Sequence, residues 1–597
     1  MTTNDDSTVL NSPQMAANLE KIEALSERLI KAVSGKQKTN PALSGPNQEL
    51  FSNAMTSYFK EMMDNPAKVF EHQAAYWGKS VKHYVEAQQV LANGKFEAPS
   101  DEFTNDRRFS NPLWNTNPYF NYVKQQYLIN AEAITQAVED TKDLDEKEKQ
   151  RLSYFSQQII DMMAPTNFLG TNPDALEKAV ATEGQSLLDG LENLVADLEA
   201  NEGELIVKLA DEKAFQLGEN IATTPGKVVY RNKMMELIQY TPVTETVHET
   251  PLIMFPPWIN KFYILDLKKQ NSLIKWITEQ GYTLFVISWI NPDASYSEVG
   301  LEDYIEDGYL AALREVKAIT GQKQVNCIGY CIAGTTLSLT LSLLKKRGDK
   351  SIKSATFFTA LTDFSEQGEF TPFLQNDFID GIEDEVNEKG MLRSHIMGRT
   401  FSFLRSNDLV YTPAIKSYMM GEAPPAFDLL FWNGDGANLP GKMAVQYLRG
   451  LCQSNDFADG GFELMGETLH LKDVDIPLCS IACETDHIAA WKSCYRGVQQ
   501  MGSKLKTFIV TQSGHIAGIV NPPSKNKYGH YTNDDMKLGP NEWFESAEFT
   551  EGSWWPRWEM WLKKRSGKQI PALNTDNPTH PELCDAPGTY VKLNARR

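Results

Sequence analysis

Val325-Asn-Cys-Ile-Gly-Tyr-Cys331-Ile-Ala-Gly334 is the stretch of sequence that decides the fold. It begins as a short apolar run, which is typical of a buried strand. The residues from Thr335 to Lys346 have helical spacing. The stretch therefore predicts a strand, a sharp turn and the start of a helix.

The predicted turn matches the nucleophile elbow Gly-x-Ser-x-Gly, with Cys331 in the serine position. Such a turn exposes the nucleophile, and the N-terminus of the following helix stabilises a thiolate. The N–H of Ile332 is placed to donate to an oxyanion. One position departs from the motif, because Ala333 stands fifth and the glycine follows at Gly334. A buried cysteine at the end of a strand is the alternative interpretation.

Strands and helices alternate on both sides of this turn. Apolar, strand-like runs occupy 252–256, 283–288 and 354–359, and helical stretches occupy 272–280 and 304–320. Such alternation predicts a mostly parallel sheet covered on both faces. The expected fold is therefore α/β, of the α/β-hydrolase type.

Two further regions differ in composition from this core. Residues 1–205 are rich in Glu, Lys, Gln, Ala and Leu, and predict a helical N-terminal domain whose first 40 residues or so are flexible. We interpret this domain as a packing or dimerisation module. Residues 206–597 are the expected catalytic domain. Within it, an irregular stretch at about 363–475, rich in Phe, Asp and Asn, predicts a cap over the active site.

Two polar positions downstream complete a candidate catalytic triad. Asp486 follows the apolar run 479–483, and His515 follows another strand and lies between small residues. Elbow enzymes place nucleophile, acid and histidine in this chain order. His487 competes with His515 for the role of base, but it adjoins Asp486, and adjacent side chains at a strand end diverge. We therefore predict Cys331, Asp486 and His515 as the triad.

A second oxyanion donor usually comes from the loop after an early strand. That loop is Phe255-Pro-Pro-Trp-Ile259-Asn-Lys, and the N–H of Ile259 or of Trp258 could serve. A proline-rich turn without such a role is the alternative.

Composition limits the other classes of function. The net charge of −20, without a block of Lys and Arg, argues against nucleic-acid binding. The sequence contains no run of about 18 apolar residues, so we expect no membrane span. Its polar start carries no secretory signal. The seven cysteines indicate reduced thiols. Cys479 and Cys483 lack a second pair at zinc spacing, so we expect no metal.

The chain resembles the polyhydroxyalkanoate synthases, especially the long single-subunit kind that uses short hydroxyacyl chains. The similarity runs from about Phe51 to near Trp561. It is carried by aromatic-rich segments at 106–114, 260–266, 288–292, 427–433, 486–488, 513–518 and 552–556.

This resemblance implies an enzyme that polymerises (R)-3-hydroxyacyl-CoA with release of CoA and without a cofactor. It further implies a cytoplasmic homodimer at the surface of polyester granules. The residues matching Cys331, Asp486 and His515 form the triad in such enzymes. Trp432 matches a residue of the substrate-access region, and His487 is a further candidate for substrate binding. Lys261, Arg399 and Arg405 are candidates for contacts with the CoA phosphates.

Two alternatives belong to other classes. One is a thioesterase or polyester hydrolase on the same fold, although ester hydrolysis mostly uses serine. The other is a non-catalytic scaffold that coats granules, which an intact triad argues against.

Overall fold

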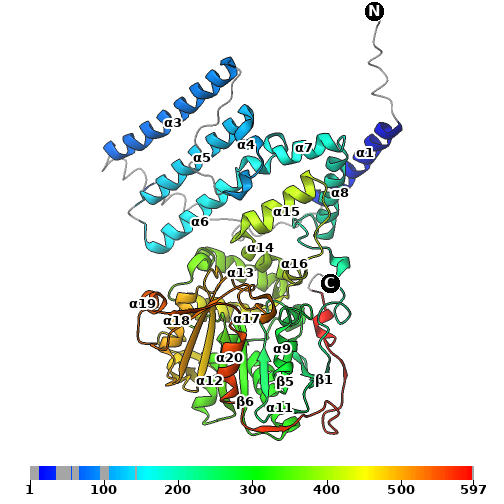
Figure 1. Ribbon diagram of the computed structural model, residues 1–597, viewed down its shortest axis with the longest axis vertical. Coiled ribbons are helices and arrows are strands. Elements are labelled where there is room, and N and C mark those ends of the chain that lie inside the picture. Colours follow the sequence, from blue (N-terminus) through cyan, green and yellow to red (C-terminus); the bar gives the residue numbers. More distant parts are fainter. Residues whose placement is uncertain (1–12, 35–55, 57–65, 94–105, 142–143, 595–597) are drawn as a thin grey trace, which may run out of the picture. The chain divides into compact units, whose positions relative to one another are not determined.

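The computed structural model describes residues 13–34, 56, 66–93, 106–141 and 144–594. The chain forms two compact units, residues 1–211 with 405–425 and residues 212–404 with 426–597 (Figure 1). Of the first 40 residues, Pro13–Ser34 form helix α1, and the others lie outside the described part.

The described part of the first unit is helical, with capping residues that fit its helix ends. Asn117 accepts from the N–H groups of Tyr119 and Phe120 at the start of α5, and Pro118 is the first helical residue. Asp145 caps α6 in the same way. The helices are α1 (Pro13–Ser34), α3 (Pro66–Asn93), α4 (Leu113–Thr116), α5 (Pro118–Glu139), α6 (Glu146–Met162), α7 (Pro173–Ala181) and α8 (Gln185–Ala200).

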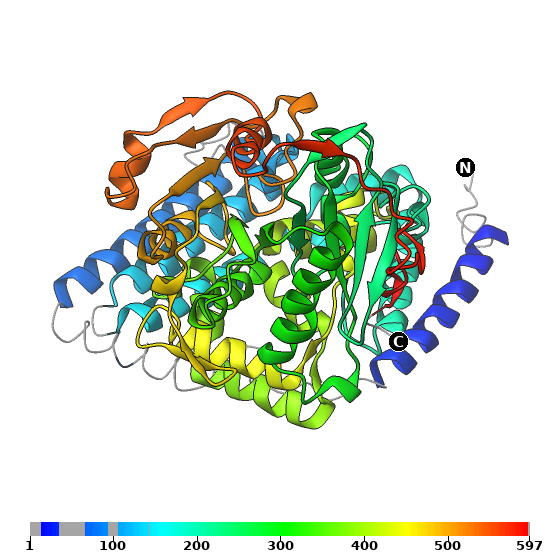
Figure 2. The same cartoon turned by 90° about the horizontal axis from the view of Figure 1, so that it is seen from below.

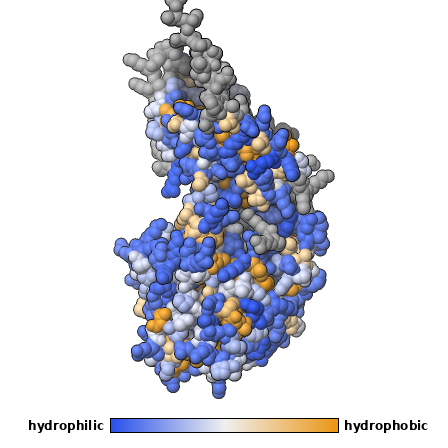
Figure 3. Space-filling model, turned by 90° about the vertical axis from the view of Figure 1, so that its right-hand side faces the viewer, coloured by the Kyte–Doolittle hydropathy of each residue, from blue (hydrophilic) through white to orange (hydrophobic). Residues whose placement is uncertain are grey.

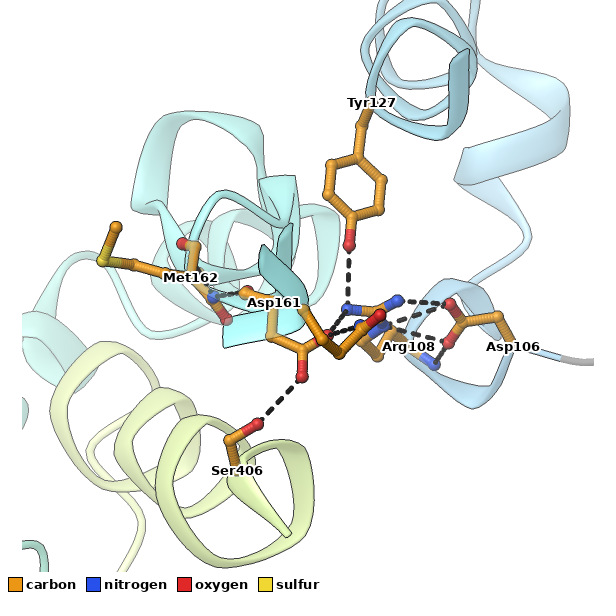
Figure 4. Close-up of polar contacts among 8 residues, drawn as sticks. Asp106, Arg108, Tyr127, Asp161, Met162 and Ser406 are labelled. Atoms are coloured by element: carbon orange, nitrogen blue, oxygen red, sulfur yellow. Dashed lines mark hydrogen bonds and ion pairs between the residues drawn. The ribbon is translucent and has the colours of Figure 1, made fainter. Parts of the chain in front are cut away.

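The segment 405–425 belongs to the first unit, although the sequence analysis assigned it to the cap. It forms η11 (Asn407–Tyr411), α15 (Thr412–Ala414) and η12 (Ile415–Met419). Ser406 donates to Asp161 at 2.9 Å, and Asp161 also pairs with Arg108 (Figure 4). Arg108 in turn binds Asp106 and donates to the Tyr127 hydroxyl. These partners lie hundreds of residues from the segment in the chain, so the sequence pattern gives no sign of them.

An eleven-stranded sheet forms the centre of the second unit, in the order β15-β14-β13-β12-β7-β6-β4-β5-β2-β1-β17. The six strands from β13 to β5 pair in parallel, whereas the outer strands pair antiparallel. Figure 2 shows β14 and β15, in orange, at one edge. The strands are β1 (Gly226–Arg231), β2 (Met235–Tyr240), β4 (Leu252–Phe255), β5 (Leu284–Trp289), β6 (Val325–Tyr330), β7 (Ile352–Phe358), β12 (Leu478–Cys483), β13 (Lys506–Thr511), β14 (His530–Thr532), β15 (Glu548–Thr550) and β17 (Cys584–Asp585).

Helices cover both faces of the sheet, as β6 illustrates. Ile328 and Tyr330 pack into a core cluster with residues of α9 (Leu273–Glu279) and α20 (Trp555–Lys563). Gly329 has the opposite side-chain direction and contacts the start of α12 (Ile332–Lys346). The connection between β5 and β6 contains η9 (Tyr304–Leu310) and α11 (Ala311–Thr320), and Tyr309 donates to the Ala333 carbonyl on the α12 side. The predicted α/β-hydrolase type of fold is confirmed.

The cap within the second unit is helical, whereas its sequence pattern predicted irregular structure. Its helices are α13 (Asn376–Lys389), α14 (Ser394–Phe403), α16 (Asp428–Gly434), α17 (Gly441–Gln446) and the π-helix η13 (Tyr447–Gln453). Asn455 ties the two ends of the cap together, because it accepts from the Phe364 N–H and donates to Asp363.

The face of the molecule drawn in Figure 3 is mostly hydrophilic, with hydrophobic residues in small separate groups. Among the described residues, no helix is both long and apolar enough to cross a membrane.

Candidate active site

Cys331 stands at the turn between β6 and α12, where the sequence pattern predicted it. Its φ of +54° and ψ of −127° are uncommon for a residue with a side chain, and its N–H donates to the Phe358 carbonyl at 2.8 Å. The thiol is half-buried and lines a pocket. The strained turn therefore presents the thiol at the N-terminus of a buried helix.

Asp486 and His515 come together from the ends of two neighbouring parallel strands, β12 and β13. The Nδ1 of His515 lies 2.7 Å from Oδ2 of Asp486, and the other Asp486 oxygen accepts from the N–H groups of Ile488 and Ala489, each at 2.8 Å. This contact engages Nδ1, so Nε2 is the nitrogen that can exchange a proton with a thiol.

The electrostatics of His515 connect all three predicted residues. Burial lowers the pKa of His515, but the Asp486 carboxylate and the Cys331 thiolate together raise this pKa well above its ordinary value. Such a site favours the protonated form of His515. The structure thus brings Cys331, Asp486 and His515 together, while their catalytic roles remain predictions.

The close approach of strand and helix at the elbow depends on Gly329 and Gly334. A Cβ atom on Gly329 would lie 2.6 Å from the Gly334 Cα, and one on Gly334 would lie 2.5 Å from the Ala360 Cβ. Both distances are too short for real contacts. Position 333 makes no such demand, which explains how the chain departs from the elbow motif there and still forms the turn.

The two candidate oxyanion donors lie at the expected loops. Ile332 is the first residue of α12, so its N–H belongs to the group that has no partner within the helix. Ile259 lines the same pocket as Cys331, and its carbonyl accepts from the Ala437 N–H. The neighbouring Trp258 is buried beside Tyr304 and does not line that pocket.

The pocket at Cys331 is lined mostly by apolar side chains of the core and the cap. They include Leu361, Phe364, Met397, Phe401, Met443 and Leu448. Such a lining disfavours water and suits an aliphatic group.

Trp432 and His487, the predicted substrate-binding residues, do not line this pocket. Trp432 is 4% exposed, packs in the core and donates from Nε1 to the Lys261 carbonyl at 2.7 Å. His487 is half-buried and directly follows Asp486. Substrate binding by Trp432 and His487 stays a prediction.

Of the three candidate CoA contacts, Lys261 is paired, since its Nζ lies 2.6 Å from Asp435. Arg399 is exposed and stands over the Phe403 ring. Arg405 belongs to the first unit.

Two residues beside the triad were not predicted from the sequence to belong to the site. Tyr330 stacks on His515, and Thr359 follows β7 next to Cys331. Thr359 could have been found from the strand order, because a residue at the carboxyl end of the neighbouring parallel strand lies at the elbow.

Two family models match the chain. Residues 105–277 match the N-terminus of poly-beta-hydroxybutyrate polymerase, and residues 251–522 match the alpha/beta hydrolase fold. The second match covers the elbow and all three predicted triad residues.

Several poly(3-hydroxyalkanoate) polymerases are similar over most of the chain. The subunit from Rhizobium meliloti is 36% identical over 96% of this chain and 95% of its own length. The polymerase from Methylorubrum extorquens is 40% identical over 82% of this chain and 81% of its own. The subunit from Cupriavidus necator is 38% identical over 89% of each.

Proposed function

The chain belongs to the poly(3-hydroxyalkanoate) polymerase family, and from this we propose that it builds polyester from (R)-3-hydroxyacyl-CoA through an acyl-Cys331 intermediate. The single observation that carries the proposal is the convergence of Cys331, His515 and Asp486 beside an apolar pocket. The relatives that match over most of the chain are named as polymerases. The enzyme is therefore of the acyltransferase type.

In the first step, His515 takes the proton of the Cys331 thiol through Nε2. The raised pKa of His515 favours this transfer. The thiolate attacks the carbonyl carbon of the acyl-CoA, and the N–H groups of Ile332 and Ile259 stabilise the oxyanion. The bond to the CoA sulfur then breaks, and the proton passes from His515 to the leaving thiolate.

In the second step, the hydroxyl of another hydroxyacyl group attacks the acyl-Cys331 carbonyl. His515 accepts the hydroxyl proton, an ester bond forms, and the Cys331 sulfur is released. Asp486 holds the Nδ1 side of His515 throughout. Since water would compete with the hydroxyl, the apolar pocket favours polymerisation over hydrolysis.

The expected partners follow from the product. A water-insoluble polyester collects in granules, and we infer that the enzyme acts at their surface in the cytoplasm, as a homodimer. Sedimentation of the full chain with and without polyester tests both parts, and a monomer that stays in solution beside granules contradicts them.

The test of the reaction is CoA release from (R)-3-hydroxybutyryl-CoA, with the product sized. The wild type releases CoA and yields a high-mass polyester, and Cys331→Ala loses at least about 10³-fold of the rate. Cys584→Ala, a change at a half-buried thiol on β17, is the matched control and keeps the wild-type rate. CoA release with free hydroxybutyrate as the main product would instead make the protein a thioesterase, and no release would contradict both.

A further inference from the structure

Thr359 has a strained backbone beside the nucleophile. It follows β7 directly, and its φ is +42°, a conformation that β-branched residues very rarely adopt. Tyr330 of β6 is paired with Phe358 of β7, so Cys331 and Thr359 leave the two strands at the same level. The elbow explains the positive φ of Cys331. Neither step of the proposed reaction requires the positive φ of Thr359.

The hydroxyl of Thr359 also contributes unfavourably to the stability of the free protein. The residue is 0% exposed and lines the pocket at Cys331. Among the residues that the structure describes, none forms a hydrogen bond with its Oγ1. A buried hydroxyl without a partner is unfavourable, because it has lost its hydrogen bonds to water. Strain and an unmet hydroxyl therefore coincide at one residue of the pocket.

Other polar groups of the pocket lining are engaged within the protein. Thr335 donates to the Leu361 carbonyl at 2.6 Å, and Gln367 donates to the carbonyls of Phe364 and Cys452. The Tyr447 hydroxyl interacts with the Cys452 thiol. Among the side chains of this lining, that of Thr359 thus holds a hydroxyl that forms no hydrogen bond with the described residues.

We propose that the Thr359 hydroxyl binds the 3-hydroxyl of the acyl group and so selects hydroxylated substrates. The inference rests on the proposed function. An acyl group on Cys331 carries two polar groups, the thioester carbonyl and the hydroxyl on C3. The N–H groups of Ile332 and Ile259 serve the carbonyl, which leaves the 3-hydroxyl without a partner in an apolar pocket. A threonine hydroxyl both donates and accepts, so it matches an alcohol.

The experiment compares Thr359→Val, which keeps the β-branch and loses the hydroxyl, with Thr359→Ser, which keeps the hydroxyl. CoA release is measured with (R)-3-hydroxybutyryl-CoA and with butyryl-CoA, which lacks the 3-hydroxyl. Thr359→Val lowers kcat/KM for the hydroxylated substrate about 10- to 100-fold and leaves acylation by butyryl-CoA within about 3-fold. Thr359→Ser retains the preference of the wild type.

A second readout separates recognition from folding. Since the hydroxyl has no partner in the free protein, Thr359→Val leaves the midpoint of urea unfolding unchanged or higher. An equal loss of rate with both acyl-CoAs, or a lowered midpoint, would mean that the hydroxyl serves the fold and would overturn the proposal.

Binding to the Cys331→Ala variant tests the same recognition without turnover. By calorimetry, Cys331→Ala binds (R)-3-hydroxybutyryl-CoA more tightly than butyryl-CoA, and adding Thr359→Val removes the difference. Equal affinities of Cys331→Ala for the two ligands would overturn the proposal. This result is distinguishable from failure of the proposed function, which appears as wild-type protein that releases no CoA or forms no polymer.

Discussion

The phenol ring of Tyr330 lies against the imidazole of His515, with ring centroids 5.8 Å apart and planes inclined by 26°. The Tyr330 hydroxyl also donates to the backbone carbonyl of His515 at 3.3 Å. The residue before the proposed nucleophile thus holds the proposed base by its ring and by its main chain. Tyr330 is fully buried, which fixes this geometry.

This contact predicts a positioning role for Tyr330. Tyr330→Phe keeps the ring and loses about 2- to 5-fold of kcat, whereas Tyr330→Leu loses at least about 20-fold, because a misplaced base transfers protons poorly. Rates at saturating acyl-CoA measure the effect. If Phe and Leu variants of equal thermal stability had equal rates, the ring contact would have no part in catalysis.

The carboxylate of Asp486 controls the charge of His515. In Asp486→Asn burial is opposed by less negative charge, so the pKa of His515 falls from its raised value. In the wild type the raised pKa means that the folded state holds the proton more tightly. This stabilisation is fully present below about pH 6.5 and is lost as the pH rises through the raised pKa.

The difference in unfolding free energy between wild type and Asp486→Asn is therefore largest near about pH 6 and shrinks toward alkaline pH. Urea unfolding at a series of pH values measures it. A difference that grows with rising pH would contradict the sign of the shift at His515.

The elbow glycines predict opposite outcomes at neighbouring positions. Gly334→Ala brings a methyl group to 2.5 Å from the Ala360 Cβ, so α12 must shift at the proposed oxyanion donor. We expect a loss of about 1–3 kcal/mol in the free energy of unfolding and at least about 10-fold in CoA release. Ala333→Gly restores the motif and costs only about 1 kcal/mol through helix propensity. Equal effects of the two changes on CoA release would refute this account of the turn.

Trp432 is tied into the core by its indole N–H. Trp432→Phe removes the donor to the Lys261 carbonyl and part of the buried ring, at a cost of about 2–4 kcal/mol in unfolding free energy. Trp561→Phe is the matched control, because the indole nitrogen of Trp561 has no hydrogen-bond partner among the described residues. It should cost about 1 kcal/mol less. A higher KM for Trp432→Phe with unchanged stability would instead favour a role in substrate access alone.

Local patterns predicted the centre of the catalytic unit. Alternating strands and helices gave the parallel core, because apolar runs and helical periodicity are local properties of the chain. The order of Cys331, Asp486 and His515 placed three side chains at one edge of the sheet, since parallel strands end together there.

Features that depend on distant partners could not be predicted in this way. The segment 405–425 belongs to the first unit through contacts such as Ser406 with Asp161, and no local pattern reports such a contact. The cap helices are interrupted by a π-helix at 447–453 and are rich in Phe and Asn, so their periodicity is weak. The close approach of Gly334 to Ala360 likewise becomes visible only once β7 lies beside the elbow.

The most direct test of the central claim is to locate the acyl group on the enzyme. Wild-type protein is mixed with a substoichiometric amount of radiolabelled (R)-3-hydroxybutyryl-CoA, quenched in acid and digested, and the labelled peptide is identified. We predict a label on the peptide that contains Cys331, released by hydroxylamine as a thioester should be and absent from Cys331→Ala. A label on a peptide with any of the other six cysteines, or one that persists in Cys331→Ala, would contradict this claim.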